Sequence, residues 1–145
     1  MTQHVSDLHD AITTIMRMLK VAETRLHAAH RELNFVPADI QTLRHVSQNA
    51  GSTLSELANH LGVVPTTASS IVDRLVARGC LSRVRPENDR RTIALALTAT
   101  GAEAFARIEA EERATMQLML DALPRADRAP FVTSMTRIAR SFSDL

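Results

Sequence analysis

The sequence predicts a mainly α-helical fold that carries one small β-hairpin. Two observations predict it. Apolar residues recur at the three- and four-residue spacing of helices over most of the 145 positions. Between residues 81 and 97 the pattern changes to a two-residue alternation, interrupted by the turn-forming segment 86–89. This change of period indicates two short strands joined by a turn.

Composition limits the class of protein. The length fits one compact domain, and 45% hydrophobic with 23% charged residues is ordinary for a globular chain. No apolar run approaches the roughly 18 residues of a membrane span and no signal-peptide pattern is present, so a cytoplasmic location is expected. The single cysteine, Cys80, excludes an internal disulfide framework. Four Phe with no Trp or Tyr argue against a stacking platform for single-stranded nucleic acid.

Residues 5–34 are predicted to form one long helix. Apolar side chains follow an unbroken three-four spacing that forms a seam along one face: Val5, Leu8, Ile12, Ile15, Leu19, Ala22, Leu26, Ala29 and Leu33. Pro37 then suits the first turn of a second helix, which runs to about Asn49. Its expected inward residues are Ile40, Leu43 and Val46.

Two short helices follow. Thr53 and Glu56 have the spacing of a capping box that opens the first helix, and Gly62 ends it. Pro65 opens the second helix, which closes at Gly79; its inward face is expected to hold Ala68, Ile71, Val72 and Leu75. Two short helices joined by a glycine-containing turn are typical of a helix-turn-helix. The hairpin directly after them has the position of a wing.

Two further helices complete the chain. Thr98 is expected to cap a helix over about residues 99–122, with these residues on or near one face: Ala102, Phe105, Ile108, Met116, Met119 and Leu120. Pro124 interrupts, and a last helix over about 126–143 carries Phe131, Met135, Ile138 and Phe142. The terminal helices flank a lobe that has its own core, so their apolar stripes predict burial against a second copy of the chain.

Charge is distributed unevenly. The formal net charge is only +1, yet the segment from Arg74 to Arg91 holds six arginines against Glu87 and Asp89, a local excess of +4 that leaves about −3 for the rest. A basic segment on an otherwise acidic body favours a protein that offers one face to phosphate. The alternative is a solvated arginine-rich hairpin.

Specific motifs occur in a fixed order. They are Thr53-Leu-Ser-Glu-Leu-Ala with Leu-Gly-Val after two more residues, Ile71-Val-Asp-Arg-Leu-Val-Ala-Arg-Gly, Arg83 followed by Asp89-Arg-Arg, and Leu97-Thr-x-x-Gly101. In these motifs the chain resembles the MarR family of bacterial regulators. The resemblance implies one domain over 1–145, with a winged helix-turn-helix lobe at 36–98 and dimerisation helices at 5–34 and 99–145.

The resemblance also implies a function. Such a chain is a homodimer that binds double-stranded DNA at a pseudo-palindromic operator, by family default as a repressor. The helix from Pro65 to about Arg78 would enter the major groove, and the wing would reach the backbone or minor groove. The implied DNA-binding residues are Pro65, Thr66, Thr67, Ser69, Ser70, Arg74, Arg85, Asn88, Asp89, Arg90 and Arg91. Within the wing, Asp89 and Arg91 would hold its shape, and Arg90 would make the deepest contact.

Three positions depart from the family pattern. Val64 stands where Ser or Thr often caps the recognition helix, Ser70 stands where Arg or Lys is frequent, and Val36 replaces a threonine. Hydroxyl groups discriminate bases less than a bidentate arginine does. The wing and DNA shape are therefore expected to supply much of the affinity. A winged-helix protein-interaction module without operator binding is the alternative function.

Release by a small aromatic or phenolic anion is common in the family. The groups in the corresponding region are Arg17, His27, His30, Arg31 and His45, which in an apolar pocket would pair with a carboxylate. The alternative is that they are solvated residues beside the seam. A metal-responsive regulator is a further alternative, because His27 and His30 lie one helical turn apart and His45 follows on the next helix.

Two other chemistries are weaker. Cys80 falls where the first wing strand begins, and the pattern favours a small buried hydrophobic residue there over a redox sensor. No phosphate-cradling glycine loop or nucleophile motif is present, so no enzyme activity and no cofactor are expected.

Overall fold

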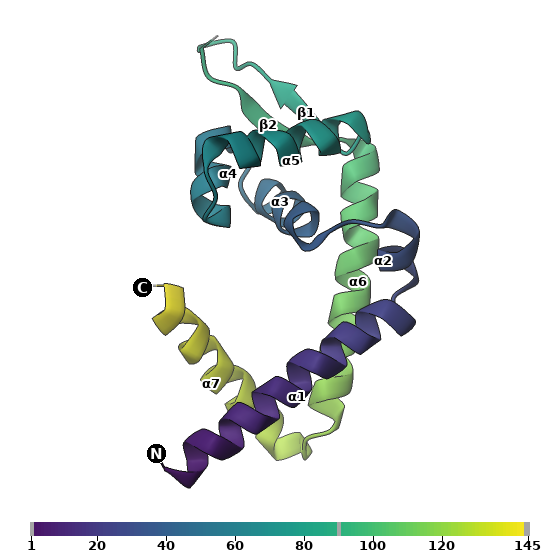
Figure 1. Ribbon diagram of the computed structural model, residues 1–145, viewed down its shortest axis with the longest axis vertical. Coiled ribbons are helices and arrows are strands. Elements are labelled where there is room, and N and C mark those ends of the chain that lie inside the picture. The colour runs from purple at the N-terminus through teal and green to yellow at the C-terminus, as the bar shows by residue number, and fades with distance from the viewer. Residues whose placement is uncertain (1, 90, 144–145) are drawn as a thin grey trace. The chain divides into compact units, whose positions relative to one another are not determined.

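The computed structural model describes residues 2–89 and 91–143, and contacts divide the chain into two units, residues 1–110 and 111–145 (Figure 1). The described residues form seven helices and one antiparallel hairpin, in the order α1, α2, α3, α4, α5, β1, β2, α6 and α7. The predicted fold class, mainly helical with one small hairpin, is confirmed. No helix of the described residues is long and apolar enough to span a bilayer.

The predicted helix over 5–34 is wrong in one respect, because it is two helices, α1 (Gln3–Arg25) and α2 (Ala28–Leu33). The chain leaves helical geometry at His27, whose φ of −91° and ψ of 92° are extended. Leu26, which belongs to the predicted seam, is 68% exposed. An apolar period predicts which face a helix buries but not whether the helix is continuous.

Hydrogen bonds and packing account for the break. Arg31 Nη1 donates to the carbonyl oxygens of Thr24 (3.3 Å) and Arg25 (2.8 Å), which lie at the end of α1 and lack helical donors. The turn then lets Ala29 enter the core, where it is 2% exposed. In α1, by contrast, no residue is buried.

Helix α3 (Pro37–Gln48) is followed by the predicted helix-turn-helix, which consists of α4 (Leu54–Leu61) and α5 (Pro65–Ala77). The capping box of α4 is confirmed, because the Glu56 amide donates to Thr53 Oγ1 at 3.2 Å and the Thr53 amide donates to Glu56 Oε2 at 3.1 Å. All the predicted inward residues of α3 and α5 are buried, namely Ile40, Leu43, Val46, Ala68, Ile71, Val72 and Leu75.

The wing consists of β1 (Leu81–Val84) and β2 (Ala94–Leu97), joined by residues 85–93. Leu81 pairs with Leu97 and Val84 with Ala94. The second strand is shorter than predicted: it begins at Ala94, and Ile93 lies outside it and is 36% exposed.

The base of the wing is joined to the helix-turn-helix by backbone contacts. The Leu95 amide donates to the carbonyl of Ser52 at 2.8 Å, and an isolated bridge pairs Ala94 with Thr53. Ala94 and Leu95 are therefore both buried, and the predicted alternation of faces does not hold there.

Helix α6 (Ala99–Asp121) begins against the base of the wing. As predicted, Thr98 caps it, with Oγ1 accepting from the Gly101 amide at 3.0 Å. A Cβ on Gly101 would lie 1.9 Å from the carbonyl oxygen of Cys80, so only glycine allows this approach. Of the residues predicted to lie on or near one face, Phe105 and Ile108 enter the core, whereas Ala102 is exposed.

The second unit contains the end of α6 and helix α7 (Arg125–Ser143). No residue of α7 is buried. Large apolar side chains are exposed on it at 43–69%: Val132, Met135, Ile138 and Phe142. Helix α1 has the same character, with Val5, Leu8, Ile12 and Ile15 exposed at 36–59%. The described chain does not cover these stripes.

Candidate nucleic-acid interface

The amino-terminal half of α5 presents a polar, uncharged face. Pro65, Thr66, Thr67 and Ser70 are exposed as expected, whereas Ser69 is half-buried. The helix begins because Val64 is extended and its carbonyl accepts from the amides of Thr67 (3.0 Å) and Ala68 (3.2 Å). No side chain caps this end. The Ser70 hydroxyl is already engaged, because it donates to the carbonyl of Thr66 at 3.1 Å.

Arg74 is held by an acidic partner on another helix. Its Nε donates to Asp39 Oδ1 at 3.1 Å, and its Nη2 reaches the same oxygen. Asp39 is 2% exposed, and its other oxygen accepts from the Val36 amide at 3.1 Å. One carboxylate therefore stabilises the start of α3 and ties α5 to it. Sequence analysis missed Asp39, because its partner lies 35 positions away and no local pattern joins them.

Two more arginines of the basic segment are engaged within the lobe. The Arg78 guanidinium donates to the carbonyl of Leu33 and lies 4.1 Å from the centroid of the Phe35 ring. Arg83 forms a surface ion pair with Asp73. Arg74, Arg78 and Arg83 are thus engaged in contacts within the lobe. They are half of the six arginines from which the sequence predicted a basic face.

The tip of the wing is shaped by Asp89. Its Oδ2 accepts from the Thr92 hydroxyl at 2.6 Å and its Oδ1 from the Arg91 amide at 2.9 Å. The hydrogen bond from Thr92 and then that from the Arg91 backbone hold the pKa of the Asp89 carboxyl below its usual value. Asp89 thus holds the turn through the backbone of Arg91, and the Arg91 side chain is exposed.

The other predicted wing residues are placed as follows. Arg85 and Asn88 are exposed, and Arg90 lies outside the described residues. Among the residues that the structure describes, no acidic group lies within ion-pair distance of Arg85 or Arg91. These two cations are therefore available to an external anion.

The matched family agrees with this geometry. The model of the MarR family matches residues 34–92, which run from the end of α2 to the tip of the wing. The repressor Rv2887 of Mycobacterium tuberculosis, an HTH-type transcriptional repressor, is 26% identical over 124 residues, covering 86% of this chain and 89% of that protein. Residues 34–92 of the chain therefore match the MarR family, and the curated relatives and solved structures support the same assignment. Its curated relatives are transcriptional regulators, in keeping with the expectation that it is not an enzyme.

Solved structures extend the match beyond the lobe. The crystal structure of Rv1404 from M. tuberculosis superposes with a TM-score of 0.78 at 26% identity, covering 99% of this chain and 97% of that one. A variant of S. aureus MepR bound to an oligodeoxyribonucleotide superposes with a TM-score of 0.62 at 17% identity, covering 90% and 97%. At this low identity, the similarity to the MepR variant shows a shared fold only.

The five residues predicted to bind an effector do not gather in one place. Arg17 is exposed on α1, and Arg31 is engaged at the end of that helix. The rings of His27 and His30 lie 4.9 Å apart. His45 instead stacks on His60 of α4, with the ring centroids 4.5 Å apart. The alternative metal set of His27, His30 and His45 is thus not assembled.

Both ring nitrogens of His45 are engaged. Nδ1 lies 3.4 Å from Asn49 Nδ2, and Nε2 lies 2.7 Å from Ser52 Oγ, within hydrogen-bond distance. Burial, and then the charge of His60, lower the pKa of His45 below its usual 6.5, against the opposing effect of Glu56. The imidazole is a structural link between α3 and the start of α4.

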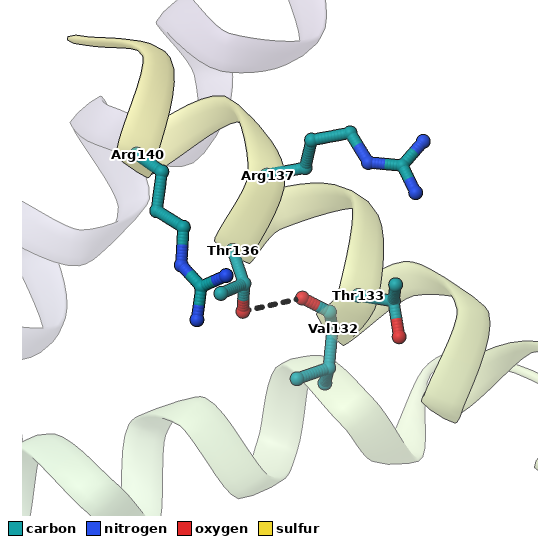
Figure 2. A pocket seen from close by; sticks show the side chains of 5 residues that line it. All are labelled: Val132, Thr133, Thr136, Arg137 and Arg140. Atoms are coloured by element: carbon teal, nitrogen blue, oxygen red, sulfur yellow. Dashed lines mark hydrogen bonds between the residues drawn. The ribbon is translucent and has the colours of Figure 1, made fainter. Parts of the chain in front are cut away.

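Cys80 and a surface depression on α7 are two further features of the chain. Cys80 is 4% exposed, and burial raises the pKa of its thiol, which disfavours the reactive thiolate and supports the interpretation as a small buried hydrophobic residue. A surface depression on α7, drawn in Figure 2, is lined by Val132, Thr133, Thr136, Arg137 and Arg140. It contains none of the predicted effector residues.

Proposed function

We propose that this MarR-family chain is a sequence-specific DNA-binding transcriptional regulator. It acts in the cytoplasm as a homodimeric repressor on a pseudo-palindromic operator. The observation that carries the proposal is the pairing, on one lobe, of an exposed helix face at α5 with a wing whose Arg85 and Arg91 have no acidic partner among the described residues. The first reads base edges in the major groove and the second neutralises phosphate.

Two comparisons support the proposal. The MepR variant is described as bound to an oligodeoxyribonucleotide, and the M. tuberculosis relative is named a repressor. The exposed apolar stripes of α1 and α7 support the homodimer, because isolated stripes of this size are usually covered by a partner. A twofold dimer presents two recognition helices, which match half-sites one helical turn apart.

Fluorescence anisotropy tests the function directly. The purified protein is titrated against the duplex DNA that flanks its own gene, at several salt concentrations and with excess unrelated DNA. Tight binding that survives the competitor and weakens steeply with salt is expected. Binding that is absent even at low salt would overturn the proposal and favour the protein-interaction module.

Arginine substitutions locate the contact on the wing. Arg85→Ala and Arg91→Ala each remove one phosphate contact per protomer. Each is expected to weaken binding and to reduce the slope of log affinity against log salt by about 2 per dimer. Arg125→Ala, an exposed arginine at the start of α7, is the matched control and leaves the slope unchanged. Unchanged slopes in both wing variants would contradict the role of the wing.

We further propose release of the DNA by a small aromatic or phenolic anion. Arg17 supports this proposal, because it is exposed and no acidic side chain of the described residues lies within ion-pair distance of it. Benzoate and phenolic acids titrated into the protein–DNA complex are expected to lower the anisotropy, and less so with Arg17→Ala. An unchanged complex at millimolar anion would leave the regulator without this mode of release.

A further inference from the structure

The recognition helix lacks the side chains that usually read bases. Between Gly62 and Val72 the sequence holds no Arg, Lys, Asn, Gln, Asp or Glu. Bidentate recognition uses Arg or Lys on guanine and Asn or Gln on adenine, and Asp or Glu accepts from cytosine. The first two turns of α5 therefore contain no side chain that can form one of these pairings.

The first charged residues of α5 are already committed. Asp73 pairs with Arg83, and Arg74 donates two hydrogen bonds to the buried Asp39. Freeing Arg74 for a guanine would leave the Asp39 carboxylate buried without its cation, which is costly. Arg74, the one cation of α5 that the sequence suggested for direct base contact, is therefore not available to DNA.

Methyl groups are what this end of the helix does expose. Val64 is 62% exposed, and the exposed Thr66 and Thr67 add one methyl group each beside the ring of Pro65. Ser70 offers no donor, because its hydroxyl hydrogen is directed to the Thr66 carbonyl. The thymine 5-methyl group is the one apolar feature of a base pair in the major groove, and apolar side chains and threonine methyl groups recognise it.

We propose that the amino-terminal turn of α5 selects thymine through its 5-methyl group. The residues that determine this specificity are Val64, Thr66 and Thr67, so the bases beneath them are T·A pairs rather than G·C pairs. Arg74 acts as a positioning residue that holds α5 against α3. The proposal rests on the DNA-binding function proposed above and adds to it the chemistry of the base that is read.

The test replaces thymine by uracil, which differs only by loss of that methyl group. A duplex is first selected by the full-length protein from a random-sequence pool, and each thymine of the winner is then replaced in turn. At the contacted positions the affinity is expected to fall about fourfold per methyl group, equivalent to about 0.8 kcal/mol. Substitution in both half-sites is expected to cost on the order of tenfold. This change is made in the DNA, so protein folding does not affect it.

Matched variants assign the effect to side chains. Val64→Ala and Thr67→Ser, which keeps the hydroxyl, are expected to bring the thymine-to-uracil affinity ratio close to one. Val36→Ala is the control, because Val36 is also an exposed residue preceding the first-turn proline of a helix and is 49% exposed. It leaves the ratio unchanged. Arg91→Ala lowers the overall affinity but keeps the ratio.

The outcomes separate this proposal from the function on which it rests. A selected, salt-sensitive duplex whose affinity is indifferent to uracil at every position overturns thymine readout and leaves DNA binding intact. The same holds if the selected half-site needs guanine and Arg74→Ala abolishes that need. No enrichment of any sequence overturns both proposals.

Discussion

At the scale of the residue, two buried polar side chains connect the helices of the winged helix-turn-helix lobe. Asp39 joins α3 to α5 through Arg74, and His45 joins α3 to Ser52 beside the cap of α4. The sequence predicts only part of each of these two connections. The sequence marks the helices on which they lie, whereas partners that lie on other elements, such as Arg74 and His60, follow from packing. A buried polar group is stable only with its hydrogen-bonding partners. Substitutions of Asp39 and His45 therefore have predictable effects on stability.

Asp39→Ala is expected to lower the free energy of unfolding by about 2–3 kcal/mol. The substitution removes a helix-capping acceptor and leaves Arg74 without its buried partner. Urea denaturation measures the change. Glu32→Ala is the control, since Glu32 and Arg107 form an exposed ion pair that contributes about 0.5 kcal/mol or less. Equal effects of the two variants would contradict the clamp.

His45 is expected to make the protein sensitive to mild acid. Its pKa in the folded protein lies below the value of 6.5 that it regains on unfolding, so the unfolded chain binds the proton more tightly. The stability is complete above pH 6.5 and declines as the pH falls below it, by at most about 1.4 kcal/mol per pH unit. Urea denaturation between pH 7.5 and 5.5 measures this.

The matched substitutions isolate that histidine. In His45→Gln the decline below pH 6.5 is expected to be smaller, because the titrating ring is gone. His9→Gln removes an imidazole that is 76% exposed and should retain the decline of the native protein. A decline that persists unchanged in His45→Gln would assign the acid sensitivity to other groups.

At the scale of the element, the ends of the helices matter as much as their faces. Gly62 ends α4 with a φ of 66°, a left-handed conformation that glycine adopts without strain. Capping signals are local, and the sequence predicted the starts of α4, α5 and α6 correctly for that reason. The break between α1 and α2 has no such local signal, because it depends on Ala29 reaching the core.

Gly101→Ala tests the junction of α6 with the wing. Alanine normally stabilises a helix by about 1 kcal/mol relative to glycine. Here its Cβ would lie 1.9 Å from the Cys80 carbonyl oxygen, so a loss of about 3 kcal/mol is expected from the displaced backbone. Thermal denaturation measures it, with Thr100→Ala on the exposed side of the same turn as the control. A gain in stability would refute the close approach.

At the scale of the whole molecule, the two terminal helices expose apolar surface that the described residues do not bury. Every residue described in α1 and α7 is exposed or half-buried, although both helices carry large apolar side chains. A stable association buries roughly 1,200–2,000 Å² in total, which stripes along two helices of 23 and 19 residues can supply. The dimer predicted from the sequence stays a prediction that these exposed surfaces support.

Ile138→Glu is expected to shift the protein from dimer to monomer. A carboxylate placed in an apolar contact loses its hydration without gaining a partner. Sedimentation velocity measures the mass, and operator affinity should fall with it because two half-sites are no longer held together. Gln41→Glu adds the same charge to an exposed position of α3 and should remain dimeric. A monomeric native protein would contradict the prediction.

The sequence by itself determined the order of elements, the caps and the buried faces of α3 and α5. These depend on neighbours within a few positions and on a regular period, which a single chain displays. It also predicted the resemblance to the MarR family through motifs at fixed spacing, and residues 34–92 match that family. Only the tertiary structure decided which arginines remain available, because Arg74, Arg78 and Arg83 meet partners on other elements. The charge pattern predicted a basic segment from Arg74 to Arg91, and packing engages half of its six arginines within the lobe.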